Sequence, residues 1–247
     1  DNLQVATATE LGVLRLFTLV DGKPVGGAVG AHAGLITGLV FAPNSSFVVT
    51  SGTDGLVRKW PKTLPATFTA TGHTQAITAV DVSANGTTIA TASSDKTARL
   101  WQRADGKPIR QLEAHPAGIT AIAFSPNGSQ VATGGVDQIP RLFQVSNGKL
   151  LKAFPAQGGS ITGVALSANG QLLAAGDRTG AVVVYKISDA SVQAKLSGHT
   201  AAISGVAFTP NSSQVLTASR DKTVRIFASA DGKAVRTINV QAEAVSL

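Results

Sequence analysis

Cysteine is absent from the 247-residue sequence, which excludes a disulfide framework, thiolate chemistry and a cysteine-based zinc site. Methionine is absent too, which indicates that these residues are not a complete translation product and that any signal peptide would lie upstream. No apolar run approaches the ~18 residues that span a bilayer, so we expect a soluble domain with no membrane partner. These absences leave the cellular localisation unknown.

A repeat of about 42 residues runs through the whole chain. From each repeat marker the chain passes through an apolar stretch, an Asn-centred turn, a second stretch with Thr, an acidic turn and a third stretch ending in an aromatic residue. The markers are His32, His73, His115, Gln157, His199 and Gln241, with spacings of 41, 42, 42, 42 and 42 residues. Helical periodicity is absent, so the pattern predicts an all-β fold.

The copy at residues 73–115 predicts four short strands, at 77–82, 88–93, 98–101 and 108–112. Asn85-Gly86 lies between the first two and is a typical hairpin signal. Asp105-Gly106 lies between the last two. Each copy therefore predicts one four-stranded antiparallel sheet.

Three residue types at fixed spacing carry a family resemblance: the marker His, an Asp 22 residues later, and an aromatic residue six after that. The matching sets are His32, Asp54 and Trp60; His73, Asp95 and Trp101; His115, Asp137 and Phe143; and His199, Asp221 and Phe227. This pattern resembles the Trp-Asp (WD) repeat family of β-propellers, including bacterial members. The high Ala, Thr and Gly content also favours a bacterial source.

The resemblance implies a buried polar network in each blade, in which the His bridges the turn Asp and a Thr that reaches the aromatic residue. The Thr residues in the matching position are Thr50, Thr91, Thr133, Thr217 and Thr7. Two copies depart from the pattern, one with Gln157, Ala175, Thr179 and Tyr185, and one with Gln241, Leu11 and Phe17. We expect the network to be lost in the first of these, and both blades to be less stable than the others.

Counting the aromatic ends of third strands predicts six blades in one domain over residues 1–247. Closing the ring would require a blade shared between the termini, begun after Gln241 and completed by residues 1–30. Six periods of 42 would need five more residues than are present. Two interpretations stay open: a trimmed or nicked six-bladed ring, or a fragment whose seventh blade lies outside these residues.

Catalysis and cofactor binding find no support in the sequence. All four His residues occupy the same repeat position, so none is left over as a general base. No ligand pair has metal-binding spacing, and no Gly-rich stretch is followed by a phosphate-binding Lys-Ser/Thr pair. We therefore predict that the chain is not an enzyme and holds no cofactor or metal.

The net charge of +7 invites a nucleic-acid interpretation. However, nine of the 21 cations recur at fixed repeat positions: Arg15, Arg58, Arg99, Arg141, Arg225, Lys23, Lys107, Lys149 and Lys233. Charge spread in this way makes no concentrated patch, and the aromatic residues also recur at core positions, leaving no base-stacking platform. Nucleic-acid binding is therefore a minority alternative.

The resemblance implies a scaffold that holds a protein or peptide on one face, through three positions per blade. These are Leu35, Thr37 and Thr53; Ala76, Thr78 and Ser94; Gly118, Thr120 and Val136; Ser160, Thr162 and Arg178; Ala202, Ser204 and Arg220; Ala244, Ser246 and Glu10. Arg178 and Arg220 stand out, and we predict that they read an acidic or phosphorylated segment. The alternative is that both are ordinary solvated turn residues.

Two other functions stay open at this point. One is a functionally silent architectural module of a larger multidomain protein. The other is an engineered, consensus-like propeller, which would explain the lack of Cys and Met, although the two degenerate copies argue against it. In each case we expect a monomer.

Overall fold

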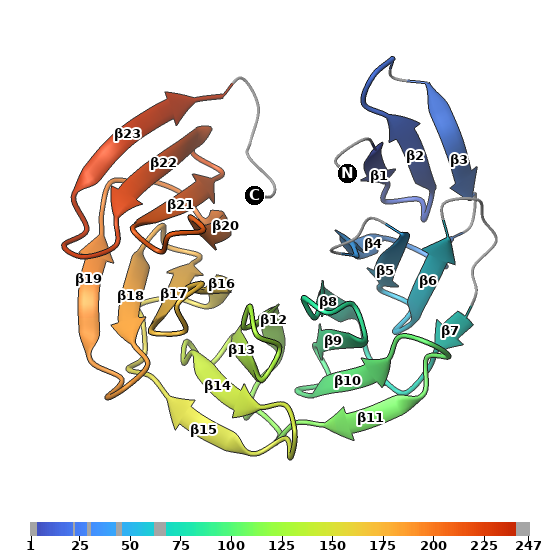
Figure 1. Ribbon diagram of the computed structural model, residues 1–247, viewed down its shortest axis with the longest axis horizontal. Helices are drawn as coiled ribbons and strands as arrows, with labels where there is room; N and C mark the ends of the chain where they lie inside the picture. Colours follow the sequence, from blue (N-terminus) through green and yellow to red (C-terminus); the bar gives the residue numbers. More distant parts are fainter. Residues whose placement is uncertain (1–3, 22, 29–30, 43–45, 62–67, 241–247) are drawn as a thin grey trace. The chain divides into compact units, whose positions relative to one another are not determined.

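The computed structural model describes residues 4–21, 23–28, 31–42, 46–61 and 68–240. The chain divides into two compact units, residues 1–115 and 116–247. The regular secondary structure of the described residues consists of β-strands (Figure 1). None of these residues forms a helix long and apolar enough to cross a membrane.

The first unit contains three antiparallel sheets, each a run of consecutive strands (Figure 1). The strands are β1 (Gln4–Ala8), β2 (Leu14–Thr18) and β3 (Pro24–Ala28); β4 (Ile36–Phe41), β5 (Phe47–Gly52), β6 (Val57–Pro61) and β7 (Phe68–Ala70); and β8 (Ile77–Val82), β9 (Thr88–Ser93), β10 (Ala98–Gln102) and β11 (Pro108–Gln111).

The second unit contains three four-stranded antiparallel sheets with the same consecutive order. They are β12 (Ile119–Phe124), β13 (Gln130–Gly135), β14 (Arg141–Gln144) and β15 (Leu150–Ala153); β16 (Ile161–Leu166), β17 (Leu172–Asp177), β18 (Val182–Lys186) and β19 (Val192–Leu196); and β20 (Ile203–Phe208), β21 (Gln214–Ser219), β22 (Thr223–Ala228) and β23 (Ala234–Asn239).

Short turns join neighbouring strands because the repeat places turn-forming residues between apolar stretches. In the β8–β9 turn, the Asn85 side chain accepts a hydrogen bond from the Thr87 N–H at 3.0 Å, and Gly86 takes the positive φ of 68° that such a turn needs. The first strand of each four-stranded sheet also has a bulge near its start, as between Ile77 and Ala79.

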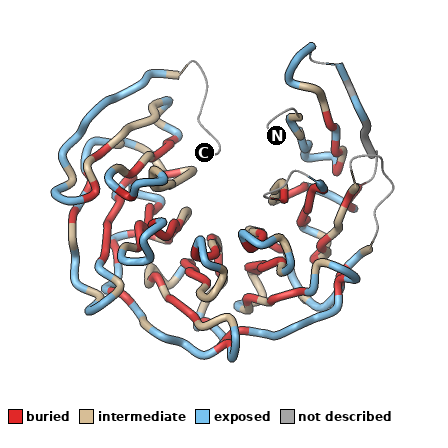
Figure 2. The backbone as a smooth tube through the Cα atoms, viewed as in Figure 1, coloured by how far each residue is buried: buried red, intermediate tan, exposed pale blue. Residues whose placement is uncertain are grey.

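The core of each unit lies between neighbouring sheets, at their second and third strands (Figure 2). In the first unit, Phe47 and Val49 of one sheet pack with Ile89 and Trp101 of the next. The fourth strands β11, β15 and β23 are largely exposed, whereas β7 and β19 each contain at least one buried residue. A β-sheet buried between two others in this way has apolar residues on both faces, which explains the buried runs along β5 and β9.

The predicted strand ranges in the copy at 73–115 agree with β8 to β11 to within one residue. Five of the described sheets have four strands, as predicted, whereas the first has three. The predicted first strand of that sheet falls in residues 241–247, outside the described residues. Ring closure and a single domain over the whole chain stay predictions.

Candidate functional site

A continuous chain of buried polar groups links Trp101, Thr91, His73 and Asp95 in the sheet β8–β11. Trp101 Nε1 lies 2.8 Å from Thr91 Oγ1, which lies 2.8 Å from His73 Nε2, and His73 Nδ1 lies 2.8 Å from Asp95 Oδ2. The indole N–H can only donate. Each group is therefore satisfied if the Thr91 hydroxyl donates to His73 Nε2 and His73 Nδ1–H donates to Asp95.

Electrostatics favour this arrangement of charges and protons. Burial lowers the pKa of His73 below the ordinary 6.5, against the raising influence of Asp95, so the ring is neutral. Burial also works to raise the pKa of the Asp95 carboxyl. Hydrogen bonds from the Thr97 side chain, from His73 and from the Thr74 N–H outweigh that effect and lower the Asp95 pKa to about 2.

The sheet β4–β7 holds the same chain with one addition. His32 lies 2.8 Å from Thr50 and 2.9 Å from Asp54, and Trp60 Nε1 lies 2.7 Å from Thr50. Arg58 also donates to Asp54 at 3.0 Å. Burial works to raise the Asp54 pKa, but hydrogen bonds from His32 and Arg58 lower it to about 2.

In the second unit, the sheet β20–β23 joins His199 to Thr217 at 2.7 Å and to Asp221 at 2.8 Å. Phe227 has no N–H, so the chain ends at the Thr217 hydroxyl. Despite some desolvation, hydrogen bonds from Thr223 and His199 lower the pKa of Asp221. In the sheet β12–β15, Thr133 is buried and Arg141 donates to Asp137; His115, the last residue of the first unit, is buried too.

The sheet β16–β19 carries a different set of hydrogen bonds at the same place. Gln157 Nε2 donates to the Ala175 carbonyl at 3.0 Å, and the Tyr185 hydroxyl donates to the Pro155 carbonyl at 3.0 Å. Asp177, which is 0% exposed, accepts from the Thr179 N–H at 2.8 Å and the Thr179 hydroxyl at 2.6 Å. The sequence interpretation missed Asp177, which lies two residues before the usual turn position.

These networks stabilise turns rather than supply reactive groups. The side chains of His32 and His73 are 0% exposed and both ring nitrogens of each have a partner, so neither can reach a substrate in solvent. Within the part of the chain that the structure describes, no three His, Cys, Asp or Glu residues group together as metal ligands.

The predicted contact residues fall into two groups: some have exposed side chains, and others have hydroxyl groups that form hydrogen bonds within the protein. Arg178 and Arg220 are exposed at the same position of neighbouring sheets, and their N–H groups donate to the Ser160 and Ala202 carbonyls at 2.9 and 3.0 Å. Glu10 is exposed, as is Leu35.

Threonine hydroxyls at the strand bulges form internal hydrogen bonds that sequence reasoning did not foresee. Thr78, Thr120 and Thr162 donate across the sheet to the carbonyls of Ala92, Gly134 and Gly176 at 3.1, 3.3 and 3.3 Å, respectively. Thr37 donates to the Ile77 carbonyl of the neighbouring sheet, and Thr120 also donates to the Ile161 carbonyl. The recurrence of a hydroxyl one residue into each first strand is the signal that could have indicated this role.

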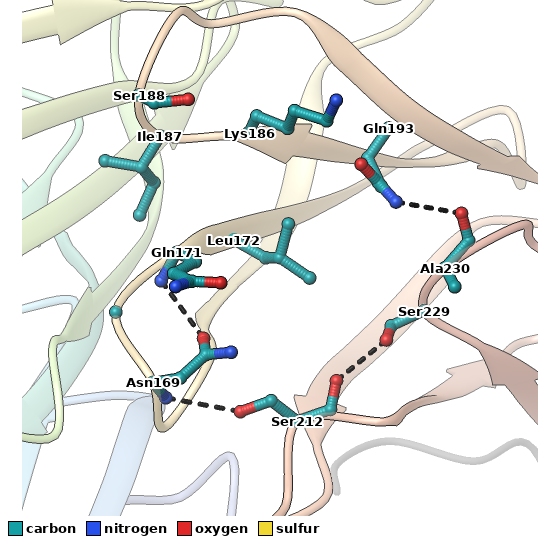
Figure 3. Close-up of a pocket in the computed structure, with 11 residues that line it drawn as sticks. Asn169, Gln171, Leu172, Lys186, Ile187, Ser188, Gln193, Ser212, Ser229 and Ala230 are labelled. Atoms are coloured by element: carbon teal, nitrogen blue, oxygen red, sulfur yellow. Dashed lines mark hydrogen bonds between the residues drawn. The ribbon is translucent and has the colours of Figure 1, made fainter.

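Sequence reasoning also missed a pocket of about 600 Å³ between the sheets β16–β19 and β20–β23 (Figure 3). Leu172 and Ile187 supply its apolar lining, and Gln193 crosses to the next sheet by donating to the Ala230 carbonyl at 2.9 Å (Figure 3). In both sheets, its lining comes from the turn between the first two strands and from the turn between the last two strands.

Antiparallel sheets of consecutive strands, with a buried His-Thr-Asp chain recurring among them, define a protein of the WD-repeat β-propeller class. The family model described as the IFT122 first beta-propeller matches residues 35–247. The chain therefore belongs to this family of propeller domains.

Similarity to a curated protein agrees with the class. The DDB1- and CUL4-associated factor 13 of Dictyostelium discoideum is 31% identical over 115 residues. The alignment covers 44% of this chain and about a quarter of the length of that relative. WD-type propellers generally act as protein-interaction scaffolds and are typically non-catalytic.

Proposed function

We propose that this chain is a non-catalytic scaffold that binds an acidic or phosphorylated segment of a protein partner through Arg178 and Arg220. The supporting observation is that two guanidinium groups stand at the same repeat position in neighbouring sheets, exposed and without a carboxylate partner among the described residues. A guanidinium that has no internal acceptor is available for bidentate contacts with a carboxylate or phosphate.

The backbone at both arginines is fixed, which lowers the ordering cost of binding. Each N–H is bonded to the preceding loop of its own sheet. Lys222 follows Arg220 closely, is exposed, and has a φ of 67°, so the turn presents two cations together. The contact positions carry no aromatic residue, which argues against capture of an apolar peptide.

We also propose that the sheets are the blades of one monomeric, ring-closed propeller in which residues 241–247 supply the first strand of the sheet β1–β3. In the five four-stranded sheets, the first strand begins four residues after the repeat marker, at Ile36, Ile77, Ile119, Ile161 and Ile203. The same offset from Gln241 gives Val245. Deleting residues 241–247 should then lower the melting temperature, and an unchanged value would contradict closure.

The function is tested by recovering partners from source-cell lysate with the native chain and with the double variant Arg178→Glu, Arg220→Glu. A control variant, Lys149→Glu with Lys195→Glu, makes the same change in net charge at two exposed cations elsewhere in the second unit. We expect a protein that the native chain and the control retain and the arginine variant loses. Mass spectrometry would identify it, and phosphatase treatment of the lysate would separate a phosphorylated from an acidic segment.

Equal recovery by all three proteins would place the partner surface elsewhere. Recovery of no specific protein by any of them would contradict the scaffold proposal and favour a silent architectural module. Recovery that both charge-reversed variants lose equally, together with nuclease sensitivity, would favour nucleic-acid binding through general positive charge.

A further inference from the structure

Two cationic side chains converge on one aromatic ring where the sheets β4–β7 and β8–β11 meet. Lys59 Nζ lies 5.2 Å from the centroid of the Phe47 ring and 5.9 Å from that of Phe68. Arg103 Cζ, from the neighbouring sheet, lies 5.0 Å from the Phe47 centroid. Both distances to Phe47 fall in the range of cation–π attraction.

Lys59 occupies a position that the repeat otherwise gives to an aliphatic residue. The equivalent residues, each directly before the aromatic end of a third strand, are Leu16, Leu100, Leu142, Val184 and Ile226. Leu100 and Leu142 are buried, and they pair across the sheet with Arg110 and Lys152, respectively. Lys59 instead pairs with Phe68. In the sheet β4–β7 the cation therefore lies on the third strand, half-buried, and the apolar residue lies on the fourth.

Phe47 is a departure from the repeat as well, because the equivalent residues are Gln4, Thr88, Gln130, Leu172 and Gln214. Arg103 stands two residues after the aromatic end of a third strand, where the other copies have Leu19, Lys62, Val145, Ile187 and Ser229, so a cation is present at this position in two of the six copies. For Arg103, Val145, Ile187 and Ser229 a shared hydrogen bond supports the equivalence, because each N–H donates to the turn between the first two strands of its own sheet. Two departures from the repeat and a cation that most copies lack thus meet at one point.

The same place between sheets in the second unit shows what these departures change. There, Leu172 stands for Phe47 and Ser229 for Arg103, and the small side chains leave the pocket of Figure 3. In the first unit, an aromatic ring and two positive charges occupy the equivalent place.

Neither cation has a counter-ion among the described residues. Other cations of the first unit do have one: Lys107 pairs with Asp105, and Arg58 pairs with Asp54. Burial and the nearby charge of Arg103 lower the pKa of Lys59. Like charges held together at a partly buried place repel each other, and a bound anion would relieve that repulsion.

We propose that Lys59 and Arg103 form an anion-binding site that takes a phosphate-type oxyanion, either free phosphate or a phosphate group on another chain. A doubly charged oxyanion can accept hydrogen bonds from both the ammonium and the guanidinium groups. Phe47 and Phe68 hold the two cations in position. This site uses the strand ends opposite to the acidic turns of its own sheets, and its residues belong to the first unit, whereas Arg178 and Arg220 belong to the second.

The test is calorimetric titration of the full chain with inorganic phosphate and, in a second arm, with a short phosphoserine peptide and its unphosphorylated form. The variants are Lys59→Leu and Arg103→Val, each of which installs the residue found at the equivalent position of another sheet and should therefore fold. Lys186→Gln removes an exposed cation of the second unit and is the matched control. Near-ultraviolet circular dichroism confirms that each variant keeps its tertiary packing.

We expect saturable binding that falls roughly tenfold or more in each of the two variants and stays unchanged in the control, as for the loss of one charge-assisted hydrogen bond. Binding of the phosphopeptide alone, with the same dependence on Lys59 and Arg103, supports the site and assigns its ligand to a phosphorylated chain. Absence of binding in both arms, equal binding by folded variants, or an equal loss in Lys186→Gln would overturn the proposal.

Discussion

The sheets β8–β11 and β16–β19 share one repeat pattern, but their buried polar side chains form different hydrogen bonds. In the first, Trp101, Thr91, His73 and Asp95 form a chain in which every donor meets one acceptor. In the second, Tyr185 fills the place of Trp101, and both rings are 1% exposed. The apolar packing of the blade is therefore preserved although the polar chain has changed.

The difference lies in which acceptors keep a partner. Asp177 accepts from the Thr179 and Ala181 N–H groups and so fixes the turn from a position two residues earlier than Asp95 does. However, Asp177 Oδ2 and Gln157 Oε1 are buried without a protein hydrogen-bond partner. The sheet β16–β19 therefore keeps the hydrogen bonds that fix the turn, but it lacks the continuous series of side-chain hydrogen bonds seen in β8–β11. Because an unpaired buried acceptor is costly, the lower stability predicted for this sheet remains reasonable and can be tested.

Breaking the complete chain at its centre should have the largest effect. Thr91→Ala removes the acceptor of the Trp101 N–H and the donor to His73 Nε2 in a fully buried place. We expect a loss of about 2–4 kcal/mol in the free energy of unfolding, as for two buried groups left without partners. Urea denaturation measures it. Thr88→Ala on the same strand is the control and should change the value by less than about 0.5 kcal/mol.

One substitution made in both sheets should have opposite signs. Asp95 receives only donors, from His73, Thr74 and Thr97, so Asp95→Asn should destabilise by about 1.5–3 kcal/mol. Asp177 stands where Ser93 donates to the Gln75 and Ala76 carbonyls. In Asp177→Asn, the amide N–H₂ would replace the unpaired Oδ2 and supply a hydrogen-bond donor at the position where Ser93 supplies one in the sheet β8–β11.

Asp177→Asn should accordingly stabilise by about 0.5–1.5 kcal/mol, the usual net value of one hydrogen bond. Urea unfolding measures the net change in the free energy of unfolding. Hydrogen exchange would show whether the amide protons of β17 become better protected. Destabilisation by both substitutions would show that the Asp177 charge is needed, and that the two sheets resemble each other more than their contacts indicate.

The smallest effect should be a dependence of stability on pH between 7 and 5. Burial lowers the pKa values of His32 and His73 in the folded chain, so the unfolded chain takes up more protons as the pH falls through 6.5. The free energy of unfolding should therefore decrease toward pH 5. His73→Gln, which imitates Gln157, should weaken this dependence in chemical denaturation at several pH values, and an unchanged slope would contradict it.

At lower pH the carboxylates should take over. The pKa values of Asp54 and Asp95 are lowered to about 2, so their contribution is complete above the ordinary 3.8 and is lost as the pH falls toward 2. Urea denaturation at several pH values below 4 would show this loss, and a free energy of unfolding that stays constant down to pH 2 would contradict it.

The local sequence pattern was sufficient to predict the strands. It was not sufficient to predict the hydrogen bonds that Asp177 and Gln157 form in the sheet β16–β19. The repeat predicted β8 and β9 to the residue, because alternating burial and turn residues are local properties. It predicted Thr179 at the turn and the loss of the network, but it did not find Asp177, since an acid two residues early looks like any strand-end residue. The hydroxyls of Thr78 and Thr120 were predicted to contact a partner, whereas they donate to strand carbonyls. The recurrence of a hydroxyl at this position was visible in the sequence, but the bulge that directs it to a carbonyl was not.

The repeat and the four-stranded sheets could be predicted from the residues of one period, and the resemblance to the WD-repeat family implied the partners of His73 and Asp95. How neighbouring periods meet within a unit follows only from the folded structure. In the sequence, each of the residues Lys59, Phe47 and Arg103 is a single difference within its own repeat. Their side chains come together only because one sheet packs on the next. The physical reason is that charge and volume at a sheet junction are sums over two periods, whereas a repeat pattern describes one.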